Sequence, residues 1–170
     1  MTSNPSSEPT LPSRPKVLID HSLGRVAMPA FFRDAGYETT TISEMFGRTD
    51  VRDVDWIAEA GRLDLVVAHK DARIRYRPAE RQAVLQAKLR MLCLTSGNMT
   101  AHDQVECFRQ NMTAIEKWWP KPGPWLLAVR RTGIEELPLV DDESDPWTST
   151  SSSPTRRPLL TTPSVRRETK

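Results

Sequence analysis

The sequence predicts an α/β fold in which a mostly parallel sheet is covered by helices on both faces. Short apolar runs, typical of buried strands, alternate along the chain with segments whose apolar residues recur at helical spacing. A strand that is followed by a helix and then by another strand favours parallel pairing, with the connecting helices packed on the faces of the sheet. The alternation therefore indicates the fold class before any single residue is considered.

The composition places the folded unit in the middle of the chain. The 170 residues are 38% hydrophobic and 27% charged, which is ordinary for a globular protein. Residues 1–15 and 141–170 are rich in Ser, Thr, Pro and charge, and they offer few apolar side chains whose burial could offset the entropy of ordering. We expect disordered tails at 1–15 and 141–170 and one domain at 16–140, which is a common domain size.

Apolar or Thr-rich runs predict five strands, which in chain order are 16–20, 37–42, 65–68, 91–94 and 125–129. The run at 65–68 is wholly apolar and is expected to be buried. The Thr-rich run at 37–42 alternates only weakly, which favours a place nearer an edge of the sheet. Residues 134–139 either pair with the last strand as a hairpin or form a tail.

Helical spacing predicts helices at 23–35, 43–46, 53–61, 78–88 and 101–119. Pro29 lies inside the first, so that helix is either bent or begins late, because proline removes a helical hydrogen bond. The third opens with acidic residues, which complement the helix dipole, and ends at Gly61. Pro78 suits the first position of the fourth helix, and the fifth has the clearest apolar stripe.

Acidic residues stand where these elements begin or end. Asp20 follows the first strand and Asp71 follows the third, and ligands of open α/β sheets bind at the carboxyl ends of the strands. Asp53 and Asp55 open a helix, and Asn98 follows the fourth strand. Convergent carboxylates without histidine ligands favour Mg²⁺ or Mn²⁺. The pattern therefore predicts a divalent-metal site.

Each acid also has a purely structural interpretation. Asp53 and Asp55 could cap their helix, which is worth about 0.5 to 2 kcal/mol for a good cap. Asp20 and Asp71 could be turn residues. The joint occurrence of these acids at one edge of the sheet favours the metal site. His69 could orient a water or a phosphate there, or it could be a packed or exposed strand residue.

A basic segment surrounds Asp71. Its residues are Lys70, Arg73, Arg75, Tyr76 and Arg77. The net charge of +2 is too small to identify a nucleic-acid partner, but this local density of charge could hold an RNA backbone, with the tyrosine stacked on a base. A solvated loop is the alternative interpretation.

Cysteine usage and hydropathy point to a cytoplasmic protein without a membrane partner. Cys93 and Cys107 lie in apolar surroundings and fit neither a metal-ligand spacing nor a disulfide framework. The sequence shows neither a signal-peptide pattern nor an apolar segment of membrane length.

Four motifs occur in a characteristic order: Asp20-His21 after the first strand, Asp-Val-Asp-Trp-Ile at 53–57, Lys-Asp-Ala-Arg-Ile-Arg-Tyr-Arg-Pro at 70–78, and Leu-Thr-Ser-Gly-Asn at 94–98. This order resembles the PIN-like domain family, in the branch related to VapC-type toxins, over about residues 16–138. The resemblance implies a three-layer α/β/α sandwich and a Mg²⁺- or Mn²⁺-dependent ribonuclease encoded beside an antitoxin.

The resemblance also implies roles for particular residues. Asp20, Asp53 and Asp71 would be catalytic metal ligands, with Asp55 as an accessory acid and Asn98 or Ser96 at a later polar position. The chain departs from the family pattern, which has a glutamate on its second helix and often a fourth aspartate. His69 also stands where a hydroxyl residue is expected.

Three functions are compatible with this sequence. The first is a metal-dependent endoribonuclease, the toxin of a toxin–antitoxin pair, with RNA as substrate, a cognate antitoxin as partner and a homodimer as its oligomeric form. The second is a non-catalytic PIN-like module that binds RNA or protein. The third is a phosphoacceptor signalling domain, which Thr95 and the pair Lys121-Pro122 fit superficially.

Overall fold

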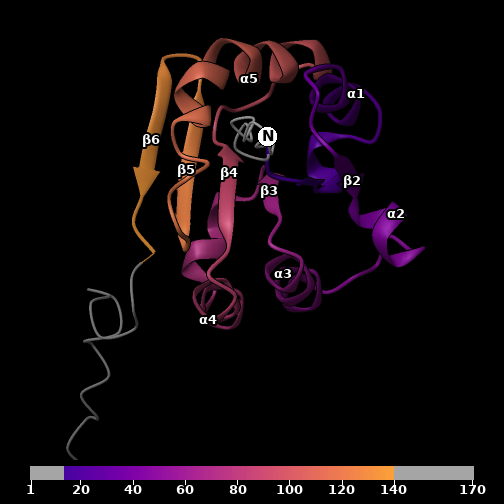
Figure 1. Cartoon of the computed structure of the whole chain (residues 1–170), viewed down its shortest axis with the longest axis vertical. Coiled ribbons are helices and arrows are strands. Elements are labelled where there is room, and N and C mark those ends of the chain that lie inside the picture. Colours follow the sequence, from indigo (N-terminus) through magenta and orange to yellow (C-terminus); the bar gives the residue numbers. More distant parts are fainter. Residues whose placement is uncertain (1–13, 140–170) are drawn as a thin grey trace, which may run out of the picture. The chain divides into compact units, whose positions relative to one another are not determined.

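A computed structural model describes residues 14–139, and the fold is set out in Figure 1. The strands are β1 (Val17–Ile19), β2 (Thr39–Thr41), β3 (Val66–His69), β4 (Arg90–Leu94), β5 (Trp125–Arg130) and β6 (Gly133–Leu137). The α-helices are α1 (Ala27–Asp34), α2 (Ile42–Phe46), α3 (Asp53–Arg62), α4 (Pro78–Gln86) and α5 (Ala101–Glu116), and two 3-10 helices are η1 (His21–Leu23) and η2 (Ala72–Tyr76).

The strands form one six-stranded sheet in the order β2-β1-β3-β4-β5-β6. Strands β1 to β5 pair in parallel with their neighbours, and β6 returns antiparallel to β5 as a hairpin. In the pair β1–β3, Leu18 lies opposite Val67. The α/β class with a mostly parallel sheet is confirmed. Because β1 and β3 are neighbours, the residues that follow them emerge at the same edge of the sheet.

Helices cover both faces of the sheet, which gives three layers. Figure 1 shows α1 and α5 together on one side and α3 and α4 on the other. Side chains of β3 alternate between the layers: Val66 packs in the same cluster as Phe32 and Phe108, whereas Val67 packs with Ile57 and Val84. Complete burial of such side chains stabilises the fold by about 1.5 to 3 kcal/mol each. The predicted three-layer sandwich is therefore confirmed.

Several predicted elements differ from the structure at their ends. The predicted helix 23–35 is η1 followed by α1, which begins at Ala27, so Pro29 lies in the first turn, where its missing N–H removes no helical hydrogen bond. The alternative of a late beginning is confirmed. The predicted helix 101–119 was too long, because α5 ends at Glu116. The basic stretch expected to be a loop contains η2.

Other expectations are met. The Thr-rich strand is β2, at one edge of the sheet, and the hairpin alternative for residues 134–139 is confirmed by β6. Pro78 is the first residue of α4. Cys93 and Cys107 are buried free thiols, as expected of small core residues.

Helices α3 and α4 run side by side in the same direction. A Cβ atom placed on Gly61, near the end of α3, would lie 2.5 Å from the Cβ of Ala87, just after α4, so the absence of a side chain at Gly61 permits the close approach. At the other end, Asp53 opens α3 and Arg77 precedes α4. The packing of the two helices therefore fixes the distance between these two residues.

The predicted tails fall almost wholly outside the described residues. Apart from Arg14 and Pro15, the segments 1–15 and 141–170 are not described, so the domain limits stay predictions. Within residues 14–139, no helix has both the length and the apolar character that crossing a membrane requires.

Candidate functional site

Asp20 lies at the end of β1, beside the end of β3. Its backbone N–H donates to the carbonyl oxygen of Ala68 at 2.9 Å, which continues the pairing of the two strands. Its carboxylate accepts hydrogen bonds from the backbone and the hydroxyl of Ser22 and caps η1. Its other oxygen lies 2.9 Å from Nδ1 of His21. Asp20 therefore does act as a turn residue, through the oxygen that contacts Ser22.

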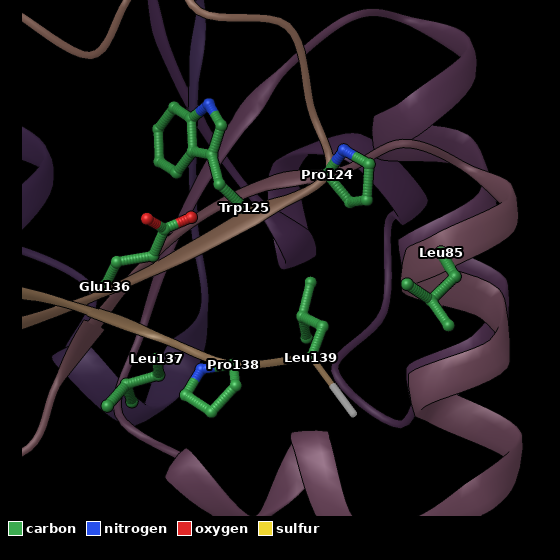
Figure 2. Close-up of a pocket in the computed structure, with 7 residues that line it drawn as sticks. All are labelled: Leu85, Pro124, Trp125, Glu136, Leu137, Pro138 and Leu139. Atoms are coloured by element: carbon green, nitrogen blue, oxygen red, sulfur yellow. The ribbon is translucent and has the colours of Figure 1, made fainter. Parts of the chain in front are cut away.

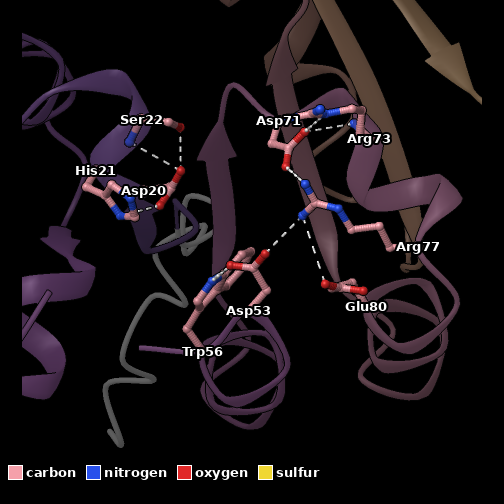
Figure 3. Close-up of polar contacts among 9 residues, drawn as sticks. All are labelled: Asp20, His21, Ser22, Asp53, Trp56, Asp71, Arg73, Arg77 and Glu80. Atoms are coloured by element: carbon pink, nitrogen blue, oxygen red, sulfur yellow. Dashed lines mark hydrogen bonds and ion pairs between the residues drawn. The ribbon is translucent and has the colours of Figure 1, made fainter. Parts of the chain in front are cut away.

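Ser22 connects this group to the other strand end. Its hydroxyl oxygen accepts a hydrogen bond from the backbone N–H of Lys70 at 3.1 Å while its hydroxyl group contacts Asp20. Figure 3 shows Asp20, His21 and Ser22 as one group beside β3. Sequence reasoning missed Ser22, although an aspartate side chain commonly accepts a hydrogen bond from the backbone N–H two residues further on.

Asp71 follows β3 and caps η2. Its Oδ1 accepts a hydrogen bond from the backbone N–H of Arg73 at 3.0 Å, and its Oδ2 lies 3.0 Å from Nη2 of Arg77. Partial burial raises the pKa of Asp71, but the hydrogen bond from Arg73 and the charges of Arg77 and Arg73 outweigh burial and leave the pKa below its ordinary value. Asp71 is therefore a carboxylate at neutral pH.

Asp53 joins the same arginine from another element. Its Oδ2 lies 3.3 Å from Nη1 of Arg77, and its Oδ1 accepts a hydrogen bond from the indole Nε1 of Trp56 at 3.0 Å. The N-cap of α3 is Arg52, and no side-chain hydrogen bond caps this helix. The capping interpretation of Asp53 is therefore wrong, although its place in the first turn still complements the helix dipole.

Asp55 is engaged elsewhere. Arg52 holds it through two hydrogen bonds of 2.9 Å, and these hydrogen bonds are the main reason that the pKa of Asp55 is lowered. No described contact joins Asp55 to Asp53 or Asp71. Of the four acids, only Asp53 and Asp71 form ion pairs with the same residue within residues 14–139.

The shared partner, Arg77, is the centre of a small ionic network. Figure 3 shows its guanidinium between Asp71 and Asp53, with the carboxylate of Glu80 on a third side at 3.9 Å. The sequence predicted Arg77 as a phosphate-binding residue, and it did not predict these acidic partners. Glu80, three residues further on, was missed as well, although this spacing is typical of an ion pair across one helical turn.

His69 is buried beneath this edge of the sheet. Its side chain is 1% exposed, and neither ring nitrogen has a hydrogen-bond partner. Burial lowers the pKa of His69 from 6.5 to about 4, although the charges of Asp20, Asp71 and Asp53 act to raise it. The imidazole is therefore neutral at pH 7, and the three carboxylates lie close enough to affect it. The packed alternative for His69 is confirmed.

The remaining predicted residues lie around the acids without direct contact with them. Ser96 is half-buried and Asn98 is exposed in the loop after β4, and no described hydrogen bond connects either one to the carboxylates. Arg75 stacks over the ring of Tyr76 at 4.4 Å, and Tyr76 is 55% exposed. More than half of Tyr76 is therefore exposed, although the Arg75 guanidinium covers one face of its ring.

A pocket of about 440 Å³ lies elsewhere in the fold. Figure 2 shows its lining, which is Leu85, Pro124, Trp125, Glu136, Leu137, Pro138 and Leu139. These residues come from α4, the start of β5 and the end of β6, so the pocket is at the end of the sheet opposite Asp20 and Asp71. Glu136 is its one ionisable lining residue, which is too little for acid–base or metal chemistry.

Asp20, Asp53 and Asp71 lie at the edge of the sheet where β1 and β3 end, which we call the acidic edge. Their carboxylate oxygens are of the type that binds a hard divalent cation. As they stand, residues 14–139 contain no group of three His, Cys, Asp or Glu side chains in a metal-holding arrangement. One carboxylate oxygen of Asp53 and one of Asp71 nevertheless contact the same positively charged group, the Arg77 guanidinium. Oxygen donors of this kind suit Mg²⁺ or Mn²⁺. Asp53 and Asp71 could hold such an ion, with Asp20 on the neighbouring strand end.

The chain was compared with known proteins. Residues 15–96 match the model of a family described as "PIN like domain". The chain is also 32% identical over 121 residues to a protein of Mycobacterium tuberculosis (strain ATCC 25618 / H37Rv) named "Putative ribonuclease VapC45", and the alignment covers 69% of this chain and 88% of that relative. No solved structure matches.

These matches define the class of protein. The alignment covers most of the relative. The mostly parallel sheet, with acids after β1 and β3, is consistent with the family match. The chain belongs to the PIN-like domain family, in its VapC-related branch.

Proposed function

We propose that this protein is a metal-dependent endoribonuclease that hydrolyses RNA phosphodiester bonds. The observation that carries the proposal is the convergence of Asp53 and Asp71 on one cationic group, beside Asp20, in a chain that is similar to a protein named as a ribonuclease. Together, carboxylates from α3 and from the ends of β1 and β3 would suit a divalent cation.

Bound Mg²⁺ or Mn²⁺ would supply Lewis-acid stabilisation of the charge that develops on the phosphate. In the proposed site, Asp20, Asp53 and Asp71 hold the ion, and Asp55 adds negative potential at the start of α3. Lys70, Arg73 and Arg75 surround this edge and hold the RNA backbone, while the exposed ring of Tyr76 stacks on a base. His69, neutral and buried, adds no charge to the site.

The relative's name also suggests a partner. We propose that the protein is the toxin of a toxin–antitoxin pair, that a cognate antitoxin binds it, and that the protein forms a homodimer. A gene for a small DNA-binding protein beside this one would support the antitoxin proposal, whereas the fold itself gives no preference for a partner.

One specific observation favours a second candidate function. Because residues 14–139 contain no group of three His, Cys, Asp or Glu side chains placed to hold a metal, a PIN-like module that binds RNA or protein without turnover is the alternative. The phosphoacceptor function has no such support. Lys121 precedes β5, and its Nζ lies 3.3 Å from the centre of the Trp118 ring, so it is at the opposite end of the sheet from Asp71.

Metal-dependent cleavage of RNA tests the proposal. The purified full chain is incubated with a mixed RNA pool in EDTA, in Mg²⁺ or in Mn²⁺, and the products are separated by size. We expect cleavage with a divalent cation and intact RNA in EDTA. Strong RNA binding with no cleavage under any of these conditions would favour the non-catalytic module instead.

A further inference from the structure

Arg77 is held at a fixed point of the backbone but carries a side chain that can move. It is both the C-cap of η2 and the N-cap of α4, and its carbonyl oxygen accepts the hydrogen bond from Arg81 N–H at 2.9 Å. Its side chain is 38% exposed, so the guanidinium can leave its partners for solvent without unpacking the core. The backbone of Arg77 is therefore fixed, while its side chain is free to change rotamer.

The guanidinium occupies oxygens that the proposed site needs. It contacts Oδ2 of Asp53 at 3.3 Å and Oδ2 of Asp71 at 3.0 Å through its two terminal nitrogens. A divalent cation bound to both oxygens would lie within a few ångströms of this positive charge, where repulsion between like charges is strong in a partly buried site. The divalent cation and the Arg77 guanidinium therefore compete for Oδ2 of Asp53 and Oδ2 of Asp71.

The cluster without Arg77 carries excess negative charge. Asp53, Asp71 and Glu80 contribute three carboxylates, and the Arg77 side chain lies within 3.9 Å of each. Of the neighbouring arginines, Arg73 contacts Asp71 only, with Nε at 3.5 Å from Oδ1, and Arg52 contacts Asp55 only. The ion pairs of Arg77 thus join Asp53 of α3 to Asp71, which follows β3.

We propose that Arg77 is a built-in counterion that neutralises the acidic edge in the metal-free protein and that a divalent cation must displace. This inference rests on the proposed function, since it concerns the same metal site. It means that the affinity for metal is lower than the carboxylates alone would give, because only molecules with the guanidinium swung away can bind the ion. The displaced guanidinium is then free to contact an RNA phosphate, so metal binding and substrate binding are coupled through one side chain.

Metal affinity measured without RNA tests the proposal. The EDTA-stripped full chain is titrated with MnCl2 in a calorimeter as the wild type, Arg77→Gln and Arg52→Gln. Arg52→Gln removes the same charge at the start of α3 but leaves the contacts of Arg77 intact, so it controls for a general change of potential. We expect Arg77→Gln to tighten Mn²⁺ binding about three- to tenfold, because it removes the partly exposed ion pairs that Arg77 forms with Asp53 and Asp71. Arg52→Gln is expected to bind as the wild type does.

The outcomes separate this inference from the proposed function. Equal or weaker Mn²⁺ binding by Arg77→Gln, or an equal gain in Arg52→Gln, overturns the counterion role and leaves the metal site standing. No Mn²⁺ binding by the wild type or by Arg77→Gln overturns both. Arg77→Lys, which keeps the charge but cannot bridge both acids with a planar fork, gives a second test in a variant that preserves the net charge. Its affinity is expected between those of the wild type and Arg77→Gln, and an affinity below the wild type overturns the role.

Discussion

Asp71→Asn is expected to lower the rate of RNA cleavage by about 100-fold or more, because a site that stabilises charge electrostatically loses about this much when one group is removed. The amide keeps the shape of the side chain, and its oxygen can still accept the hydrogen bond from the backbone N–H of Arg73. It loses the negative charge that would hold a divalent cation. Initial rates on one RNA, at a saturating Mn²⁺ concentration for the wild type, measure the effect.

Asp64→Asn is the matched control for this experiment. Asp64 precedes the same strand at its other end, its side chain is 90% exposed, and its positive φ of 53° is one that asparagine tolerates. The control is expected to cleave as the wild type does. Equal rates for Asp71→Asn, Asp64→Asn and the wild type would show that Asp71 is only a cap of η2.

Lowering the pH from 7.5 to 5 is expected to reduce the free energy of unfolding by about 2 kcal/mol through His69 alone. The pKa of His69 is about 4 in the folded protein, because of burial, against 6.5 in the unfolded chain. Between these values the unfolded chain binds the proton and the folded protein does not, so stability falls as the pH is lowered. Near pH 4 the loss approaches about 3 kcal/mol. Urea unfolding in EDTA at each pH measures it.

A variant that cannot titrate isolates this effect from that of the carboxylates. His69→Gln is expected to lose much less stability between pH 7.5 and 5 than the wild type, whatever its stability at pH 7.5. His102→Gln, which changes an exposed histidine at the start of α5, should keep the wild-type slope. If His69→Gln and the wild type have the same pH dependence, His69 is not held neutral by burial.

The fold was predictable because the apolar periodicity of the chain is consistent throughout. Runs such as Val66–Val67–Ala68 are apolar on both faces, and only a sheet covered on both sides buries them completely. Element ends were less predictable, since they depend on local hydrogen bonds. The helix after Asp20 begins late because Asp20 and Ser22 stabilise a 3-10 turn first.

The order of strands and helices along the chain predicted where the acids lie, but not which residues contact them. Strand ends place Asp20 and Asp71 at one edge, and a helix start places Asp53 nearby. The bridge through Arg77 joins residues 24 positions apart and depends on how α3 packs beside α4, which no local spacing encodes. The burial of His69 likewise depends on tertiary packing, whereas its position at a strand end is compatible with either a packed or an exposed side chain.

Asp20 is proposed to bind the same cation as Asp53 and Asp71, although its carboxylate contacts His21 and Ser22 in the metal-free protein. Mn²⁺ binding followed by electron paramagnetic resonance, on the EDTA-stripped wild type and on Asp20→Asn, measures what Asp20 contributes. We expect saturable binding by the wild type and an affinity about tenfold weaker for Asp20→Asn, a loss of about 1.4 kcal/mol. Equal affinities for the two proteins would exclude Asp20 from the site.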